Sequence, residues 1–307
     1  MTAPDLEYVA LVVDQPARSA EFFARDLELP SVKVKLGTHD VPAVAVGRTA
    51  LAFFAPQDPF VNCTTHSGVH HIAIAAEQPA QRARELGLPI DFENEGLNGR
   101  AQVELSADAT SGVRTRLTEP LALADGLSAS IERIDHLGVA SSDNHLARKA
   151  FVDTLGCVYE SQQTDSEFES LAENFTSDRY PNVFHTRPAR LSGSLRVLFV
   201  TVGDCEMEFL QDLTATVATD TARHDRAGDT RGDRSAIARY VNRRGPGLHH
   251  LALKTPNIDQ LLTRLGSAGH RMIDTVGRPG SRRARIGFVH PVATGGVLLH
   301  FVEREEI

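Results

Sequence analysis

The histidine-bearing stretch Gly247-Leu248-His249-His250-Leu251-Ala252-Leu253 is best read with two later segments, Arg285-Ile286-Gly287-Phe288-Val289-His290-Pro291 and Gly295-Gly296-Val297-Leu298-Leu299-His300-Phe301. The first stretch predicts a strand, residues 255–266 or 255–269 predict a helix, and the later segments predict a hairpin. The last strand of that hairpin would return His300 to the side of His250. Because imidazole is the commonest metal ligand in proteins, two histidines on neighbouring strands outline a metal site.

The same order of elements occurs four times along the chain. Short apolar strands are predicted at 8–13, 71–75, 136–139 and 250–253, and each is followed by a helix and further strands. The helices begin at a cap residue or an early proline, such as Asp14 with Pro16 in the first repeat and Ser142 or Asp143 in the third. An internal repeat of this kind predicts four copies of one structural unit.

Length and composition limit the kinds of protein that this chain can be. A chain of 307 residues suggests two domains, and the absence of a long apolar run predicts a soluble globular protein without a membrane span. Residues 1–13 carry acids where an export signal needs basic residues, so we expect no export. The three scattered cysteines then indicate reduced thiols in the cytoplasm. The formal net charge of −8 argues against a nucleic-acid partner.

The C-terminal half is longer than the N-terminal half between equivalent points. From Tyr8 to His71 is 63 positions, whereas from His136 to His250 is 114, a difference of 51 residues. Two segments supply most of the difference: 164–191, rich in polar and turn residues, and 214–234, rich in Asp, Arg and Thr. Long insertions in compact domains are commonly lids, binding loops or disordered segments. We expect 164–191 to be a lid and 214–234 to be a mobile segment.

The C-terminal residues carry a resemblance to a known family. The runs GLHHLALKTPNIDQLLTRLGSAGHRMID (247–274) and RARIGFVHPVATGGVLLHFVE (283–303) resemble the C-terminal half of a methylmalonyl-CoA epimerase, and the match is dense over 235–305. The chain is therefore identified as a member of the vicinal oxygen chelate superfamily. That superfamily also includes glyoxalase I, the fosfomycin- and bleomycin-resistance proteins, extradiol dioxygenases and 4-hydroxyphenylpyruvate dioxygenase.

This resemblance implies an α+β fold of four βαβββ modules, paired into two domains whose curved mixed sheets enclose a cavity. The N-terminal domain is expected over 1–122 and the C-terminal domain over 130–307, with the division near 122–128. The tandem arrangement is more similar to the extradiol dioxygenases and 4-hydroxyphenylpyruvate dioxygenase than to the single-domain epimerases.

Strand alternation tests whether the polar residues of the C-terminal half share one face of its sheet. In each of four predicted strands, apolar residues alternate with one residue that could bind a metal. Those residues are His136, Glu208, His250 and His300. The apolar residues would then face the helices, and the metal-capable residues would face the cavity.

The resemblance also implies that the first and last strands of each C-terminal module supply one metal ligand each. The matching positions are His136, Glu208, His250 and His300, with histidine at the last position where relatives carry glutamate. Glu206 faces the same way as Glu208 and is the alternative carboxylate. Three imidazoles and one carboxylate suit Fe(II), Ni(II), Co(II), Zn(II) or Mn(II), of which we favour Fe(II). The competing interpretation is that these are core histidines that hydrogen-bond their neighbours.

The equivalent positions in the N-terminal half hold Tyr8, Ala52, His71 and Arg116, among which only one is a good ligand. We therefore expect a metal-free domain that serves in packing, in dimerisation or in shaping the cavity, and a structural role for His71. The pairing of modules favours a homodimer as the oligomeric state.

Other polar residues are candidates for contact with a substrate. His290 is either a proton donor near the metal or a structural residue of its His-Pro turn. A basic cluster just before it would either clamp a substrate carboxylate or a CoA phosphate, or lie in a solvated loop. The cluster comprises Arg282, Arg283 and Arg285. In the first insertion, His185 and Tyr180 are expected to reach the substrate from the lid.

Three kinds of function fit this reading. Members of the superfamily bind adjacent oxygens of a small substrate to the metal, which polarises a carbonyl, stabilises an enediolate or holds the substrate beside oxygen. The tandem layout favours an Fe(II)-dependent dioxygenase. The alternatives are a non-redox isomerase, epimerase or lyase with His300 or His290 as base, and a small-molecule binding or resistance protein. The carboxylates that serve as bases in the epimerases are missing, at His300 and in the stretch 195–198.

Overall fold

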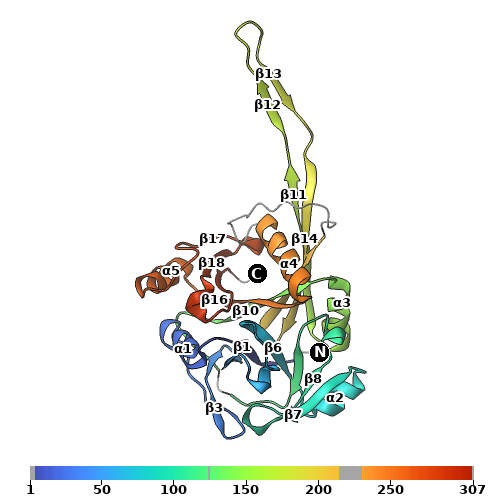
Figure 1. The fold of residues 1–307 in the computed structure, drawn as a ribbon, viewed down its shortest axis with the longest axis vertical. Helices are drawn as coiled ribbons and strands as arrows, with labels where there is room; N and C mark the ends of the chain where they lie inside the picture. The colour runs from blue at the N-terminus through green and yellow to red at the C-terminus, as the bar shows by residue number, and fades with distance from the viewer. Residues whose placement is uncertain (1–3, 124, 214–229, 306–307) are drawn as a thin grey trace.

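The chain folds into two curved sheets, one from each half of the sequence. A computed structural model describes residues 4–123, 125–213 and 230–305. Figure 1 shows the N-terminal sheet in the lower part of the view, the C-terminal sheet above it, and a long arm that projects from the C-terminal half.

Two modules form the N-terminal half. The first comprises β1 (Leu6–Val12), α1 (Pro16–Glu21) with a π-helical continuation (Phe22–Asp26), a hairpin of β2 (Val34–Leu36) and β3 (His39–Val41), β4 (Ala43–Val46) and β5 (Thr49–Phe54). The second comprises β6 (Gly68–Ala75), α2 (Pro79–Glu85), β7 (Ile90–Glu95), β8 (Ala101–Leu105) and β9 (Thr115–Thr118). Seven of these strands form one sheet in the order β4-β5-β1-β6-β9-β8-β7.

The C-terminal half repeats this plan with additions. Its first module comprises β10 (Arg133–Ser141), α3 (Asn144–Arg148) continued as a π-helix (Lys149–Thr154), β11 (Val158–Glu169), β12 (Ala172–Phe175), β13 (Val183–Thr186), β14 (Arg190–Val202) and β15 (Cys205–Asp212). Helix α4 (Thr230–Arg244) leads into β16 (Gly247–Lys254), α5 (Ile258–Ser267), β17 (Arg278–Pro279), β18 (Arg285–Val289) and β19 (Leu299–Glu303). None of the described helices has the length and apolarity needed to cross a membrane.

The same strand pairing occurs in both halves. The first strands of the two modules pair antiparallel, β1 with β6 and β10 with β16. Each first strand also pairs in parallel with the last strand of its own module, as β10 does with β15 and β16 with β19. This pattern confirms the predicted α+β fold of curved mixed sheets. It places β15, β10, β16 and β19 side by side in the middle of the C-terminal sheet.

One apolar core lies on the faces of the sheets that pack against the helices. On β10 and β16, Leu137, Val139, Leu251 and Leu253 are fully buried in a cluster that continues through the helices to the strands of the N-terminal sheet. Burial of one such side chain contributes about 1.5–3 kcal/mol, and a one-residue slip of a strand would turn all of them outward. The core therefore fixes the register, which leaves the opposite face for the polar residues.

The insertion 164–191, for which the sequence predicts a lid, instead forms most of the projecting arm. β11 and β14 pair antiparallel over their whole length, and β12 and β13 extend the ribbon. In Figure 1 the arm points away from both sheets. Large apolar side chains on it are exposed, among them Phe168, Phe175, Tyr180 and Phe184. The lid prediction is corrected accordingly: the insertion pairs with itself as an antiparallel ribbon that extends away from the cavity.

Part of the second insertion forms the start of helix α4. Residues 214–229 of the expected mobile segment 214–234 lie outside the described residues, whereas 230–234 form the first turn of α4. Ile237 on α4 is buried against the concave face of the C-terminal sheet, in a cluster with Leu195 and Phe199. This helix therefore covers the face on which the polar residues lie.

Candidate metal centre

Three histidine side chains meet on the concave face of the C-terminal sheet. His136 lies on β10, His250 on β16 and His300 on β19, and the strand register places His136 and His300 on either side of Ala252. All three side chains are buried. Each offers one ring nitrogen, and these three atoms lie within 4.8 Å of one another. Such a spacing allows one ion to contact all three rings.

Gly138 makes room for one of these rings. It lies opposite His250 in the pairing of β10 with β16. A Cβ atom at position 138 would lie 2.0 Å from Cε1 of His250, which no side chain can do without displacing the ring. The sequence His136-Leu137-Gly138 thus supplies a metal-capable residue together with the space that its neighbour needs.

Glu208 on β15 adds a carboxylate beside the histidines. Its Oε2 lies 3.2 Å from Nε2 of His136 and 3.7 Å from Nε2 of His250, and those two nitrogens are 3.3 Å apart. Burial acts to raise the pKa of Glu208, but the charge of His136 and the hydrogen bond with His250 outweigh it and lower that pKa. The carboxylate is therefore ionised, which is the form that binds a metal.

Asp135 lies directly behind His136. Its Oδ1 accepts a hydrogen bond from Nδ1 of His136 at 2.7 Å, and its Oδ2 lies 3.2 Å from the guanidinium group of Arg304. Because Nδ1 carries the shared proton, Nε2 can present its lone pair to the cavity. Burial lowers the pKa of His136, but the carboxylates of Glu208 and Asp135 outweigh burial and raise it overall.

The other two histidines are held in the neutral form. Burial lowers the pKa of His250, and burial together with the neighbouring histidines holds the pKa of His300 well below its ordinary value. The Nδ1 atom of His300 is buried and has no hydrogen-bond partner among the described residues. A buried polar atom without a partner is costly, and coordination to an ion would satisfy it.

The histidines lie at the base of a cavity of about 630 Å³, a volume typical of small-molecule sites. Its walls are mainly apolar, and the ring of Phe288 lies 4.6 Å from the ring of His300. The other large apolar residues that line it are Leu195, Val197, Phe199, Leu210, Ile237, Ile273, Ile286, Leu298 and Val302. Charged side chains that also reach the cavity include Asp165, Arg282 and Arg304. The site can therefore hold a small, largely apolar molecule against the histidines.

Comparison with known families identifies the fold. Residues 135–288 match the family described as the Glyoxalase/Bleomycin resistance protein/Dioxygenase superfamily. The chain belongs to this superfamily. A superfamily assignment confirms the resemblance carried by the GLHH and GGVLLHF motifs of the sequence.

Known proteins that are similar to this chain match either just over half of its length or nearly all of it. The uncharacterized protein YqjC of Bacillus subtilis (strain 168) is 23% identical over 173 residues, which are 56% of this chain and 93% of that protein. A mutant of 4-hydroxymandelate synthase from Streptomyces coelicolor matches with a TM-score of 0.59 and 17% identity, over 99% of this chain and 94% of the synthase. Methylmalonyl-CoA epimerase from Mycobacterium tuberculosis matches with a TM-score of 0.39 and 23% identity, over 59% of this chain and 93% of the epimerase. The likeness to the synthase shows that the fold is shared across both halves.

In the N-terminal half, a hydrogen-bonded network fills the positions that correspond to the histidine site. Tyr8 donates to Gln102 at 3.0 Å, and its hydroxyl lies 3.2 Å from Nε2 of His71. Arg116 is fully buried and pairs with Glu104 at 2.9 Å. The fourth position, Ala52, is buried and offers no polar group. His71 is thus built into the packing of this superfamily domain, in keeping with the structural role expected for it.

Of the predicted arginine cluster, only Arg282 reaches the cavity. Its guanidinium group lies 4.2 Å from the centre of the Phe199 ring. Arg283 does not line the cavity, and Arg285 points to α5, where it pairs with Asp259 at 2.6 Å. The predicted clamp of three arginines is therefore corrected to one, because the 3-10 turn Ser281–Arg283 sends successive side chains in different directions.

Three further predicted residues lie away from the histidines. Glu206 pairs with Arg282 at 2.7 Å, so Glu208 is the carboxylate beside the imidazoles. His290 caps the turn Pro291–Thr294, where its Nδ1 accepts from the backbone N–H of Val292 at 3.2 Å, and it does not line the cavity. His185 is exposed on β13 of the arm. The structure thus corrects the catalytic role predicted for His290 and the substrate contact predicted for His185.

Sequence reasoning missed three charged residues of the site. Asp135 immediately precedes His136, and a carboxylate next to a metal-binding histidine could have suggested its orienting role. Arg304 follows β19, and Asp165 lies on β11 at the base of the arm. Burial is the main cause that raises the pKa of Asp165. The sequence around Arg304 and Asp165 does not indicate a role in the site, because both residues reach the cavity only through pairing of strands that are distant in the sequence.

Proposed function

We propose that this protein is a divalent-metal-dependent enzyme that binds adjacent oxygens of a small substrate in the C-terminal cavity, and that it is an Fe(II)-dependent dioxygenase. The observation that carries the proposal is the convergence of three buried imidazoles, each with a ring nitrogen within 4.8 Å of the other two, in a cavity with mainly apolar walls. Three buried imidazoles beside an ionised carboxylate match the ligands that iron and similar metals prefer.

The residues present fit such an ion. His136, His250 and His300 would hold it, and Glu208 lies within reach as a fourth ligand or as a hydrogen-bond partner of the rings. The buried Nδ1 of His300 is costly without a hydrogen-bond partner, and coordination to a cation would satisfy it. A bound divalent ion would supply Lewis acidity and, if it is Fe(II), activation of oxygen.

The protein itself would position the substrate and exclude water. If His136, His250 and His300 alone held the ion, coordination positions would remain for two substrate oxygens and for oxygen. Phe288 and Phe199 line the cavity, where they would contact an apolar substrate body, and α4 covers the cavity. The tandem fold shared with 4-hydroxymandelate synthase adds support for a dioxygenase.

Nitric oxide tests the dioxygenase proposal without knowledge of the substrate, because it binds Fe(II) at an oxygen site and gives a characteristic EPR signal. Protein loaded anaerobically with Fe(II) should give this signal at one iron per chain. His136→Ala should abolish it, whereas His185→Ala, on the exposed arm, should not change it. If Fe(II) binds stoichiometrically but nitric oxide gives no signal, the dioxygenase proposal fails and the metal site stands.

A second candidate is a non-redox isomerase, epimerase or lyase, and Asp165 is the observation that favours it. Its carboxyl reaches the same cavity, and its pKa is raised chiefly by burial, which favours a group that accepts and returns a proton. If Glu208 also binds the ion, only two open positions remain, enough for a chelating substrate alone. Anaerobic exchange of deuterium at a carbon next to a carbonyl, lost in Asp165→Asn, would support this candidate, and its absence with 2-oxo acid and thioester probes would count against it.

A further inference from the structure

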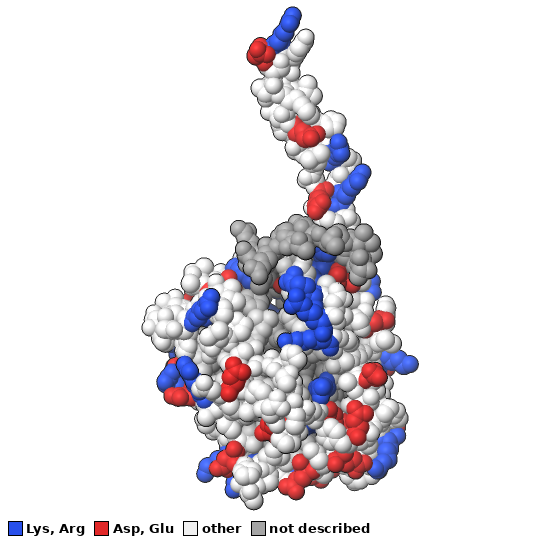
Figure 2. All heavy atoms as spheres, in the orientation of Figure 1, with Lys and Arg blue, Asp and Glu red and all other residues white. Residues whose placement is uncertain are grey.

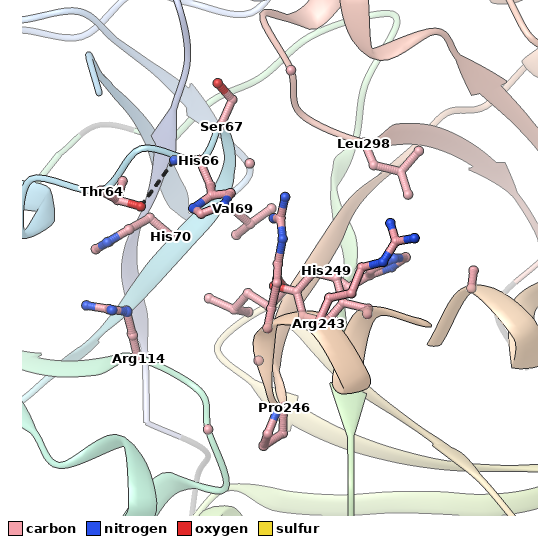
Figure 3. Close-up of a pocket in the computed structure, with 18 of the residues that line it drawn as sticks. Thr64, His66, Ser67, Val69, His70, Arg114, Arg243, Pro246, His249 and Leu298 are labelled. Atoms are coloured by element: carbon pink, nitrogen blue, oxygen red, sulfur yellow. Dashed lines mark hydrogen bonds between the residues drawn. The ribbon is translucent and has the colours of Figure 1, made fainter. Parts of the chain in front are cut away.

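A second cavity lies between the two halves of the chain. It has a volume of about 610 Å³ and is lined by residues of both sheets and of α4. Figure 3 shows the N-terminal residues Thr64, His66, Ser67, His70 and Arg114 facing Arg243 and His249 of the C-terminal half across this cleft. The interdomain cleft, as we call it, is therefore a product of the tandem arrangement and has no counterpart within either half alone.

The charge of the interdomain cleft differs from that of the whole chain. The chain carries a formal net charge of −8, yet no aspartate or glutamate is among the described residues that line the cleft. Four arginines line it: Arg114, Arg239, Arg243 and Arg244. Figure 2 shows basic side chains gathered in the middle of this face of the molecule. We propose that the interdomain cleft binds a small organic phosphate or diphosphate.

The arginines of α4 are available for such a ligand. Arg239 and Arg243 are separated by one helical turn, so they project from the same side of α4. Both are exposed, and neither forms an ion pair within the described part of the chain. The helix dipole favours basic residues in the last turn of a helix. Arg239 lies before the last turn of α4, so the dipole does not explain why an arginine is there. Uncompensated guanidinium groups that share a cleft favour an anionic ligand.

The N-terminal half contributes a cation from the opposite wall. Arg114 lies 3.8 Å from Glu104, but that carboxylate already pairs with the buried Arg116 at 2.9 Å. The charge of Arg114 is therefore only partly balanced. Burial, and then the charges of Arg114 and Arg116, lower the pKa of His70 to about 3, which agrees with a positive potential on this wall. An anion in the interdomain cleft would contact cations from both domains.

Two glycines hold the walls of the cleft close together. Gly112 has φ +84°, and a Cβ there would lie 2.4 Å from the carbonyl oxygen of Pro246 in the other half. Gly296 has φ +102°, and a Cβ there would lie 2.5 Å from Cβ of Ser67. Both positions therefore need glycine for conformation and for space. Because both contacts cross between the domains, they fix the spacing of the walls before any ligand binds.

The size of the interdomain cleft selects a small molecule over a polymer. Its volume lies within the range of cofactor and metabolite sites. A nucleic acid would instead have to approach a chain of net charge −8, which is unfavourable. The hydroxyl groups of Thr64 and Ser67 add neutral hydrogen-bond donors to the guanidinium groups. This combination of donors suits phosphate oxygens.

The interdomain cleft adjoins the histidine cavity. Ala236, Arg239, His249 and Leu298 line both. His249 stands between them, because its Nδ1 is 3.0 Å from Nδ1 of His250. The phosphate could therefore belong either to a separate ligand or to a substrate that also reaches the histidines. The inference does not depend on the proposed dioxygenase activity, since it rests on a different set of residues.

Calorimetric titration with inorganic pyrophosphate tests the inference directly. The wild-type protein should bind one pyrophosphate per chain, and Arg243→Gln and Arg114→Gln should each weaken binding at least about tenfold. Arg243→Lys should retain part of the affinity, and Arg179→Gln, at the tip of the arm, should retain all of it. Equal thermal melting of the variants would exclude unfolding as the cause. If all variants bind pyrophosphate equally weakly, or the wild type does not bind it, the inference is overturned.

Two further measurements distinguish the possible sources of the phosphate. His136→Ala should still bind pyrophosphate, which separates this inference from the metal site; loss of binding in that variant with its fold intact would overturn the inference of an independent cleft. A phosphorylated 2-oxo acid, 3-phosphohydroxypyruvate, then serves as the spanning probe. Loss of its affinity in both His136→Ala and Arg243→Gln would identify a ligand that spans the cavities, and loss in Arg243→Gln alone would identify a separate ligand.

Discussion

Replacement of Asp135 by asparagine should weaken metal binding while every metal-facing side chain stays in place. Asp135 is fully buried, and its Oδ1 accepts from Nδ1 of His136 at 2.7 Å. Asparagine keeps the shape of the residue but removes its charge, and its amide can face Nδ1 with a donor instead of an acceptor. The imidazole of His136 would then lose both its orientation and part of its basicity.

The size of the effect follows from that one contact. A distance of 2.7 Å between nitrogen and a carboxylate oxygen is typical of a charge-assisted hydrogen bond, which is roughly twice as strong as a neutral one. Loss of a carboxylate that orients a metal-binding histidine commonly weakens metal affinity about 10- to 100-fold, or about 1.4–2.7 kcal/mol. The substitution also weakens the interactions of Arg304. Its guanidinium group would keep the ion pair with Glu206 at 3.3 Å but would lose the ion pair with Asp135.

Competition with a chromophoric chelator measures the Co(II) affinity of Asp135→Asn, and the visible spectrum of bound Co(II) reports its ligand geometry. Asp259→Asn is a matched control, because it also removes a carboxylate that pairs with an arginine, but on α5 and away from the cavity. The control should keep wild-type affinity. Binding by Asp135→Asn within about twofold of wild type, with an unchanged fold, would refute the reasoning.

Three more predictions follow from the described contacts. Arg116→Leu should lower the free energy of unfolding by about 3–5 kcal/mol in urea titrations, because it removes the main cation that pairs with the buried Glu104. The metal content should not change. A loss of stability below about 1 kcal/mol would contradict this prediction. Because the pKa of His136 is raised above its ordinary value of 6.5, metal must displace a proton there, so Co(II) affinity should rise with pH until His136 is deprotonated and then level off. An affinity that does not change with pH would count against this. We propose that the exposed apolar arm forms the interface of the homodimer suggested by module pairing. Light scattering should then give about twice 33.4 kDa for the wild type, and a double variant with Phe175→Ser and Phe184→Ser should be monomeric. A double variant with the mass of the wild type would argue against the arm as the dimer interface.

The parts of the fold and site that could be predicted are those governed by local periodicity. Strand alternation turns His136, His250 and His300 to one face because the residues between them must join the core. The repeat of strand and helix then determines which strands become neighbours, since each module pairs in the same way. These two regularities predict that the three histidines share one face, whereas the superfamily fold and the ligand positions are predicted from the resemblance of residues 247–274 and 283–303 to the epimerases.

The parts that could not be predicted depend on contacts between distant residues. The polar sequence of 164–191 is compatible with a loop or with a ribbon whose two faces are both exposed, and strand pairing decides the outcome. Arg282 and Arg283 are adjacent in sequence, but the backbone turn at both, each with positive φ, sends only one of them to the cavity. His290 is recruited by its own turn as a cap, a local hydrogen bond that the His-Pro pattern does not distinguish from a catalytic role.

Elemental analysis of protein purified without chelators tests the central claim most directly. The account predicts one divalent ion per chain in the wild type and in His185→Ala, and strong loss of that ion in His136→Ala, His250→Ala and His300→Ala. Iron as the bound metal would also support the proposed dioxygenase. A wild-type protein that cannot be loaded with any of Fe(II), Co(II), Ni(II), Mn(II) or Zn(II), or histidine variants that keep a full complement of metal, would contradict the site.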